Sequence, residues 1–489
     1  MKLRSTTWGV VGGLFVACLT TLPASAAPPA ALKWTDCEVR PTEDPELVRG
    51  SKCATLQVPV DWNRPAGPTF GLVIARRTAK IPAARVGTLF FAPGGPGDSG
   101  VDRIRTGMTR FPELIEERFD IVSFDPRGIA RSNPVVCSAA LLAQQPSPVI
   151  ADRAAFEQTI RYNRDLAQDC RANTGPLYDH VDTLQSVRDV EAIRAALGES
   201  KLTFHGSSYG TLLGQQYAER YPHRLRALVL ESVFDHGDAT TGRWLDDQAA
   251  TVQDSFSEFV KWCKQTTTCS LHGRDISALW ADLVARAARG ELPDPRQSAL
   301  KATPYSLTFG AFRQLYEPRW AALANLLKRL DESAPPTGEP PVPTGLAPNP
   351  LAPFCRDLSL PVRTYGEFAA HLRRIARNTA DLKLPPTLMA VTNCLGLPKA
   401  PNPQRDVEVH GLRTPALLLN SLHDPATGYA GASSVARQLG KQGVLVTYEG
   451  WGHGVYNSGP CTQQAVNDYL VALKLPPRST RCAAVPPTG

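Results

Sequence analysis

Apolar and polar residues follow two different periods along this chain, and the change from one period to the other predicts the fold. Short apolar runs have the length of buried strands, and amphipathic stretches with helical spacing lie between them. This alternation predicts an α/β fold with a doubly wound, mostly parallel sheet. Residues 54–62 and 70–76 alternate in the manner of paired antiparallel strands at one sheet edge. The predicted central strands cover residues 87–92, 119–124, the run before Gly206, 225–230, 415–420 and 444–448.

The alternation of strands and helices stops between residues 235 and 402. Helical periodicity dominates there, with proline-rich connections between the helical stretches, which predicts an inserted helical cap. The α/β core would then consist of residues 27–234 and 403–489. The expected cap helices cover residues 244–266, 276–288, 309–329 and 365–375.

Residues 1–26 have the pattern of a secretory signal peptide. Lys2 and Arg4 precede an apolar stretch at residues 8–22, and Ala24-Ser25-Ala26 resembles a cleavage site. No later stretch reaches the length that a membrane-spanning helix needs. We therefore expect a secreted, extracellular protein without a membrane span.

The cysteines fit an oxidising compartment. One of the 11 cysteines lies in the signal peptide, so an even number remains for disulfides. Sequence cannot fix the connectivity, and no spacing matches a zinc site. Near neighbours suggest Cys37–Cys53, Cys137–Cys170, Cys263–Cys269, Cys355–Cys394 and Cys461–Cys482.

Composition narrows the class of partner. The chain has 489 residues, of which 43% are hydrophobic, enough for one large core with an inserted second lobe. Its formal net charge of +7 is mild, and its basic residues are scattered. Nucleic acid is therefore not an expected partner. We expect a monomer.

The central feature of the sequence is Gly206-Ser207-Ser208-Tyr209-Gly210. An apolar strand precedes it and the amphipathic stretch 212–220 follows it, as in a nucleophile elbow. Glycines at both ends remove side chains that would collide in so tight a turn. Ser208 would then project above the sheet edge, at the N-terminus of a helix.

A glycine-rich turn follows the predicted strand 87–92. Backbone N–H groups in such a turn can approach a substrate closely, although Pro96 has none to donate. Gly95 or Gly94 would therefore supply one oxyanion-hole donor, and we assign it to Gly95. The N–H of Tyr209, the residue after the serine, would supply the other.

Two later strands end in the residues that a serine nucleophile needs. Strand 415–420 leads to Asp424, and strand 444–448 leads to His453. Imidazole is suited to take the serine proton, and a carboxylate holds the imidazole in the correct tautomer. The order Ser208, Asp424, His453 is that of α/β-hydrolases.

Several other residues could compete for these roles. Asp357 and Asp406 are alternative acids, although neither follows a clear apolar strand, and His423 is expected to be a loop neighbour. Gly97-Asp98-Ser99-Gly100 resembles the nucleophile motif of chymotrypsin-like proteases. Those enzymes place the histidine before the serine, but no histidine precedes Ser99.

The mature chain resembles the secreted tripeptidyl aminopeptidases of actinomycetes, which are α/β-hydrolases related to the prolyl aminopeptidases. This resemblance implies a serine exopeptidase that releases short peptides from free N-termini, with no metal or cofactor. The chain departs from the family at Ala130, where glycine is usual, and at Gly428, where proline is usual. The matching segments are Phe91-Ala-Pro-Gly-Gly-Pro-Gly, Phe124-Asp-Pro-Arg-Gly, Gly206-Ser-Ser-Tyr-Gly-Thr, Trp262-Cys with Cys269, Asp424-Pro-Ala-Thr, Gly452-His-Gly and Cys461 through Cys482.

A peptidase of this kind needs a carboxylate for the substrate's ammonium group. Glu231 ends the strand that follows the elbow helix and should point toward the site, so we predict that it binds substrate. A buried carboxylate must be neutralised, and a salt bridge to an arginine such as Arg243 explains Glu231 equally well. Glu317 and Asp357 are weaker candidates for the anchor.

The expected chemistry is acyl transfer, but the triad does not distinguish amides from esters. The alternative is therefore a secreted carboxylesterase or lipase with the same three residues. A third possibility is a catalytically silent binding protein, against which the complete set Ser208, Asp424 and His453 argues.

Overall fold

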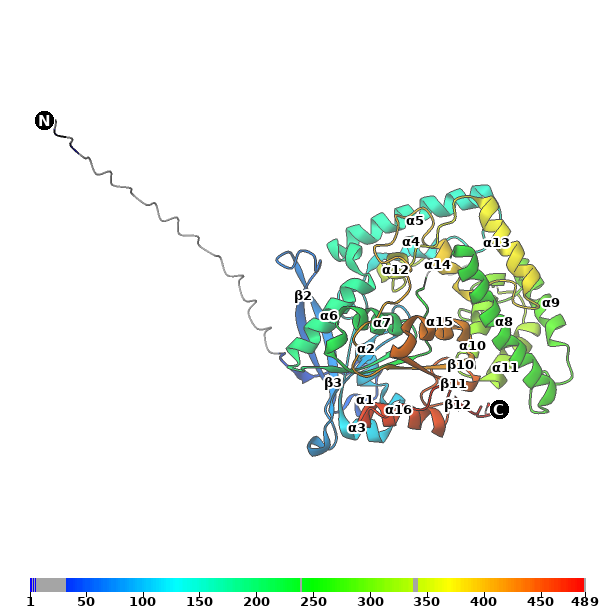
Figure 1. Ribbon diagram of the computed structural model, residues 1–489. Coiled ribbons are helices and arrows are strands. Elements are labelled where there is room, and N and C mark those ends of the chain that lie inside the picture. The colour runs from blue at the N-terminus through cyan, green and yellow to red at the C-terminus, as the bar shows by residue number, and fades with distance from the viewer. Residues whose placement is uncertain (2, 4, 6–31, 238–239, 337–341, 488–489) are drawn as a thin grey trace.

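The computed structural model describes residues 32–237, 240–336 and 342–487, together with residues 1, 3 and 5 (Figure 1). The predicted signal peptide at residues 1–26 lies almost entirely outside the described residues. None of the described helices is long and apolar enough to cross a membrane.

A ten-stranded sheet forms the centre of the molecule. Its strand order is β1-β2-β3-β5-β4-β7-β8-β10-β11-β12. The pairs from β1 to β5 are antiparallel and all the others are parallel, which confirms the predicted sheet and its antiparallel edge. The strands are β1 Thr35–Asp36, β2 Lys52–Pro59, β3 Thr69–Arg77, β4 Gly87–Ala92, β5 Phe119–Phe124, β7 Leu202–Ser207, β8 Leu225–Glu231, β10 Ala416–His423, β11 Gly443–Trp451 and β12 Arg481–Cys482.

Helices cover both faces of this sheet, because its central strands are apolar on both sides (Figure 1). One face packs against α6 Thr183–Ala196, α7 Gly210–Arg220 and α15 Tyr429–Leu439. The other packs against α1 Pro45–Val48, α2 Gly100–Arg105, α3 Glu113–Arg118 and α16 Pro460–Ala472. The result is the three-layered arrangement of an α/β-hydrolase.

The chain between β8 and β10 is mostly helical, and in Figure 1 helices α8, α9 and α11 lie together at one side of the molecule, whereas α12 lies near α4. Buried residues such as Phe256, Trp280 and Trp320 give it an apolar core of its own. A stretch with a separate core can fold over a sheet without disturbing it, as expected of an inserted cap. Its elements are α8 Thr241–Gln265, α9 Ile276–Ala288, α10 Pro304–Leu315, α11 Trp320–Asp331, β9 Leu346–Pro348, α12 Phe354–Asp357, α13 Tyr365–Asn378 and α14 Met389–Thr392.

An earlier part of the chain joins this helical layer. Helix α5, Arg153–Thr174, contacts α13 (Figure 1). The ring centroids of Phe156 and Phe368 lie 6.5 Å apart in this contact. Strand β6, Val136–Ser138, pairs with β9, and the short helix α4, Ala139–Ala143, follows it. The helical layer thus includes residues before 235, so the domain limits drawn from the sequence remain a prediction.

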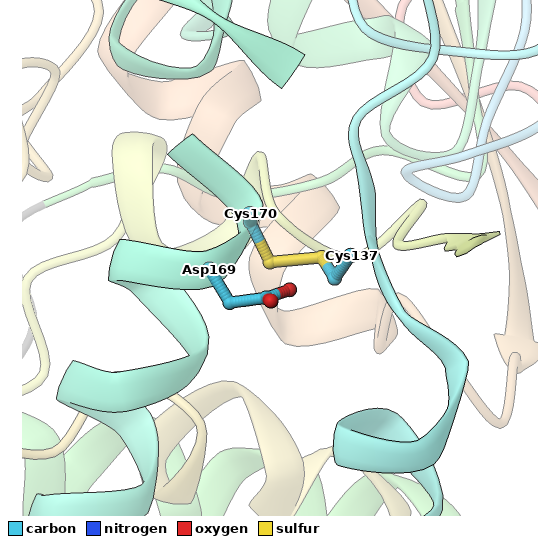
Figure 2. A group of neighbouring side chains, drawn as sticks. All are labelled: Cys137, Asp169 and Cys170. Atoms are coloured by element: carbon cyan, nitrogen blue, oxygen red, sulfur yellow. A yellow bond between two sulfur atoms is a disulfide. The ribbon is translucent and has the colours of Figure 1, made fainter. Parts of the chain in front are cut away.

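All five suggested disulfides are formed. Figure 2 shows one of them, Cys137–Cys170, with the carboxylate of Asp169 beside it. Among the described residues, these three make up the one group with ligand atoms close enough to hold a metal ion. The two sulfurs are bonded to each other, and Asp169 accepts a hydrogen bond from the Ser138 N–H at 2.7 Å. The group is therefore a structural cross-link.

Candidate active site

Ser208 sits in a tight turn between β7 and α7. Its φ of +57° lies in the left-handed region, which is strained for a residue with a side chain. A Cβ atom on Gly206 would lie 2.5 Å from the carbonyl oxygen of Gly210, and one on Gly210 would lie 2.3 Å from that of Ala92. Only glycine fits at these two positions, so the two glycines of the motif make this tight turn possible.

Backbone hydrogen bonds hold the strained serine in place. The Ser208 N–H donates to the carbonyl oxygen of Glu231 at 2.9 Å, which ties the turn to strand β8. The Thr211 hydroxyl and N–H both donate to the Ser208 carbonyl oxygen, at 2.6 and 2.9 Å. The side chain is left free to face the cavity.

Asp424 and His453 follow two neighbouring parallel strands, β10 and β11, and therefore meet at the same sheet edge. The Nδ1 atom of His453 lies 3.0 Å from each carboxylate oxygen of Asp424. Asp424 is buried and also accepts hydrogen bonds from the N–H groups of Ala426 and Thr427 and from the Thr427 hydroxyl. The carboxylate is thus fixed, and it orients the imidazole.

The loop that carries His453 is anchored on both sides. The His453 N–H donates to the carbonyl oxygen of Tyr316 at 2.6 Å, and the rings of these two residues lie 4.7 Å apart. The next N–H, that of Gly454, donates to the Ser232 hydroxyl at 2.7 Å. The inserted segment and the residue that follows strand β8 therefore both position the histidine.

Ser208 and His453 line one cavity of about 510 Å³, which we call the Ser208 cavity. Gly94 and Gly95 line it too, and a Cβ atom on Gly94 would lie 3.3 Å from the Ser208 hydroxyl oxygen. Within the described residues, the N–H groups of Gly94, Gly95 and Tyr209 make no hydrogen bond. Each is available to an oxyanion, so the choice between Gly94 and Gly95 stays a prediction.

Glu231 lies under the elbow and is already neutralised. Its carboxylate is buried and receives Arg110 at 2.7 Å, His205 Nε2 at 3.0 Å and the Tyr456 N–H at 2.7 Å. Burial alone would raise its pKa, but the Arg110 charge and the hydrogen bonds from His205 and Tyr456 hold that pKa well below the usual range.

These contacts change the interpretation of Glu231. A carboxylate whose two oxygens are occupied within the protein has little capacity left for a substrate ammonium group. The neutralising arginine is Arg110 rather than Arg243, which instead lies 3.8 Å from Asp247. Arg110 also donates to the Ser207 hydroxyl at 2.7 Å. Glu231 and Arg110 together thus brace the strand end beside the candidate nucleophile.

The competing candidates lie elsewhere. Asp357 is buried and accepts hydrogen bonds from the Thr183 N–H at 2.8 Å and the Tyr209 hydroxyl at 2.6 Å, so it contacts the elbow rather than His453. Asp406 lines a separate cavity of about 630 Å³. His423 Nδ1 lies 2.8 Å from Asp254.

Ser99, the serine of the chymotrypsin-like motif, has a structural role. Its hydroxyl caps helix α2 by accepting the Asp102 N–H, and it donates to Asp125 at 2.5 Å. At the second family departure, a Cβ atom on Gly428 would lie 2.2 Å from the Thr251 hydroxyl oxygen. A proline at position 428 would therefore require the Thr251 side chain to move.

Comparisons with known proteins agree with this architecture. The family model described as "TAP-like protein" matches residues 386–482, which include Asp424 and His453. Carboxylesterase B of Mycobacterium tuberculosis is 30% identical to the chain over 492 residues, covering 92% of the chain and 89% of that protein. Serine protease Hip1 of the same organism is 29% identical, covering 92% and 91%.

The tripeptidyl aminopeptidase of Streptomyces lividans is 26% identical over 498 residues, covering 94% of the chain and 88% of that protein. These relatives match the chain over nearly its whole length, and the resemblance seen in the sequence is confirmed. The chain belongs to the tripeptidyl aminopeptidase-like family of α/β-hydrolases.

Proposed function

We propose that the protein is a secreted serine exopeptidase that hydrolyses peptide bonds near free N-termini, in the manner of a tripeptidyl aminopeptidase. The observation that carries this proposal is the strained Ser208 in one cavity with His453, whose ring is held by both oxygens of Asp424. Two relatives are named as peptidases, Hip1 and tripeptidyl aminopeptidase.

The mechanism follows from the positions of these groups. The Ser208 hydroxyl attacks the scissile carbonyl carbon while His453 accepts its proton, and Asp424 stabilises the imidazolium. The N–H groups of Gly95 and Tyr209 hold the oxyanion. His453 then donates the proton to the leaving amine, which departs and leaves an acyl-enzyme.

Water completes the reaction. It attacks the acyl carbon while His453 again accepts a proton, and collapse of the second tetrahedral intermediate releases the acid and returns the proton to Ser208. Every proton in this cycle stays within the triad and the reactants. We propose no metal or cofactor, because each step is supplied by these side chains and N–H groups.

The wall of the Ser208 cavity favours a peptide over an apolar ester. It carries several charged side chains, among them the carboxylates Asp98 and Glu317. Both carboxylates form ion pairs with arginines, but these pairs are exposed to water and weak, whereas Glu231 is buried in its pair, so Asp98 and Glu317 are the candidates for binding the ammonium group of a substrate. A lipase would need an apolar wall here. A carboxylesterase remains the second candidate, because one relative bears that name.

The setting of the enzyme belongs to the same proposal. Five disulfides suit an oxidising compartment, and the pattern at residues 1–26 suits export. We propose that residues 235–402 act as a cap over the site in a monomeric enzyme. Tyr316 supports this role, because the inserted segment reaches His453 through it.

Hydrolysis of chromogenic anilides tests the proposal. Substrates with one, two or three residues, each with a free or acetylated N-terminus, would be compared with a short-chain ester, using the wild type and Ser208→Ala. The proposal predicts turnover of free-amine tripeptide anilides that is lost on acetylation and in the variant. Ester cleavage without anilide turnover would move the assignment to carboxylesterase. Absence of any turnover would favour a binding protein.

A further inference from the structure

The Ser208 cavity carries more positive than negative side chains on its wall. Two carboxylates and four arginines line it: Asp98, Glu317, Arg103, Arg110, Arg313 and Arg319. Three of the arginines have a carboxylate partner. The pairs are Arg103 with Asp98 at 3.0 Å, Arg319 with Glu317, and Arg110 with the buried Glu231 at 2.7 Å.

Arg313 is the exception, because it makes no ion pair within the part of the chain that the structure describes. Its guanidinium carbon lies 4.8 Å from the centroid of the Tyr316 ring. That ring lies 4.7 Å from the ring of His453. An uncompensated positive charge therefore stands one aromatic ring away from the candidate general base.

No other carboxylate of the site takes up this charge. Asp424 is 1% exposed, accepts hydrogen bonds from His453 and Thr427, and does not line the cavity. Glu231 is likewise buried and paired with Arg110. Arg313 is exposed to solvent on the cavity wall, so its guanidinium is available to a negative group of a substrate that enters the cavity.

We propose that Arg313 selects peptides that carry an acidic side chain close to the scissile bond. This inference rests on the proposed function, since it names the substrate class of the same site. The Tyr316 ring separates Arg313 from His453. Consecutive Cα atoms in a peptide are about 3.8 Å apart, so a side chain one or two residues from the reacting carbonyl can cover the width of that ring and reach Arg313. A guanidinium stacked on a ring keeps its N–H edges free for a carboxylate.

Matched peptide pairs test this selection. In each pair one position, from the third residue before the scissile bond to the second after it, is either Glu or Gln, and all peptides have free N-termini. Each pair is made with a C-terminal amide and with a free C-terminus. Because Glu and Gln differ in charge but hardly in shape, their ratio of kcat/KM isolates the charge. Cleavage is followed by mass spectrometry for the wild type, Arg313→Gln and Arg329→Gln.

Arg329 is the matched control, since it is an exposed arginine on α11 that does not line the cavity. The wild type and Arg329→Gln should cleave the Glu peptide about tenfold faster than the Gln peptide at one position, the size expected of a charge-assisted hydrogen bond. Arg313→Gln should lose this preference, so that its ratio of kcat/KM for the Glu and Gln peptides falls to about one. High salt should reduce the wild-type preference.

Other results would overturn the inference. Equal cleavage of Glu and Gln peptides by the wild type, or a preference that persists in Arg313→Gln, would remove Arg313 as the selecting residue. A preference that follows the free C-terminus would assign the charge to a terminal carboxylate and reject the acidic side chain. Failure to cleave any peptide, Gln peptides included, would contradict the proposed function itself and is thereby distinguished from failure of the selection alone.

Discussion

Replacing Asp182 with asparagine should stabilise the protein at alkaline pH and leave its stability unchanged at acidic pH. Asp182 caps helix α6 by accepting the Gln185 N–H at 3.1 Å, and only 3% of the residue is exposed. Burial, with the negative charge of Asp357 nearby, raises the pKa of Asp182 from 3.8 to about 6. Asparagine caps helices as well as aspartate does, but it carries no charge.

The size and sign of the effect follow from this pKa. One pKa unit corresponds to about 1.4 kcal/mol, so a rise from 3.8 to about 6 costs about 3 kcal/mol when the carboxyl is ionised in the folded state. The folded state binds the proton more tightly than the unfolded state does. The cost is therefore absent below pH 3.8, grows between pH 3.8 and 6, and is fully present above pH 6.

Thermal unfolding between pH 4 and 8 measures this dependence. For a chain of this size, about 1 kcal/mol shifts Tm by about 1 °C, so Asp182→Asn should raise Tm by about 3 °C at pH 8 and by almost nothing at pH 4. Asp152→Asn is the matched control. Asp152 caps α5 through the Ala155 N–H at 2.8 Å but is exposed, so that change should have little effect at either pH.

Two results would show that the ionised Asp182 does not destabilise the folded protein. If Asp182→Asn raised Tm equally at pH 4 and pH 8, the gain would not come from an ionised carboxyl. If Asp152→Asn gave the same gain, burial would not be its cause. Peptidase activity should be retained in Asp182→Asn, because the cap of α6 is preserved.

Three further substitutions test the site. Asp424→Asn should lower kcat in anilide assays by about 10³- to 10⁴-fold, because the imidazole of His453 loses the acceptor that fixes its tautomer. Tm should change little. An unchanged kcat would exclude Asp424 as the acid. Glu231→Gln should lower the free energy of unfolding by about 3 kcal/mol, because Arg110 loses its buried partner. Urea denaturation measures this change. An unchanged free energy of unfolding would show that the pair does not brace the elbow. His423→Ala should keep kcat within about threefold of the wild type in the same anilide assay, since His423 pairs with Asp254 outside the triad. A large loss of kcat would show that His423 takes part in catalysis.

The candidate triad could be located from sequence because each member follows a recognisable strand. Ser208 lies between two glycines that the turn requires, and Asp424 and His453 come within two residues of the ends of the apolar strands β10 and β11. Parallel neighbouring strands end at one sheet edge, so their order along the chain predicts where these side chains meet. The disulfides could be suggested for a related reason: each joins cysteines no more than 39 residues apart.

The environment of Glu231 could not be predicted in the same way. Its partner Arg110 lies 121 residues earlier, in a short 3₁₀ turn that has no hydrophobic pattern of its own. Composition shows that a buried carboxylate needs a cation but does not select one arginine among many. The packing of α5 on α13 was equally inaccessible, since an amphipathic helix reveals its apolar face but not the element that covers it.

Identification of the residue that a serine-directed phosphonate modifies would test directly whether Ser208 is the nucleophile. The wild type and Ser208→Ala would be treated with a peptidyl phosphonate that carries a free N-terminus, then digested and analysed by mass spectrometry. We expect one adduct per chain, on Ser208, with loss of activity in proportion to labelling and no adduct in the variant. An adduct on another serine, or full activity in Ser208→Ala, would contradict it.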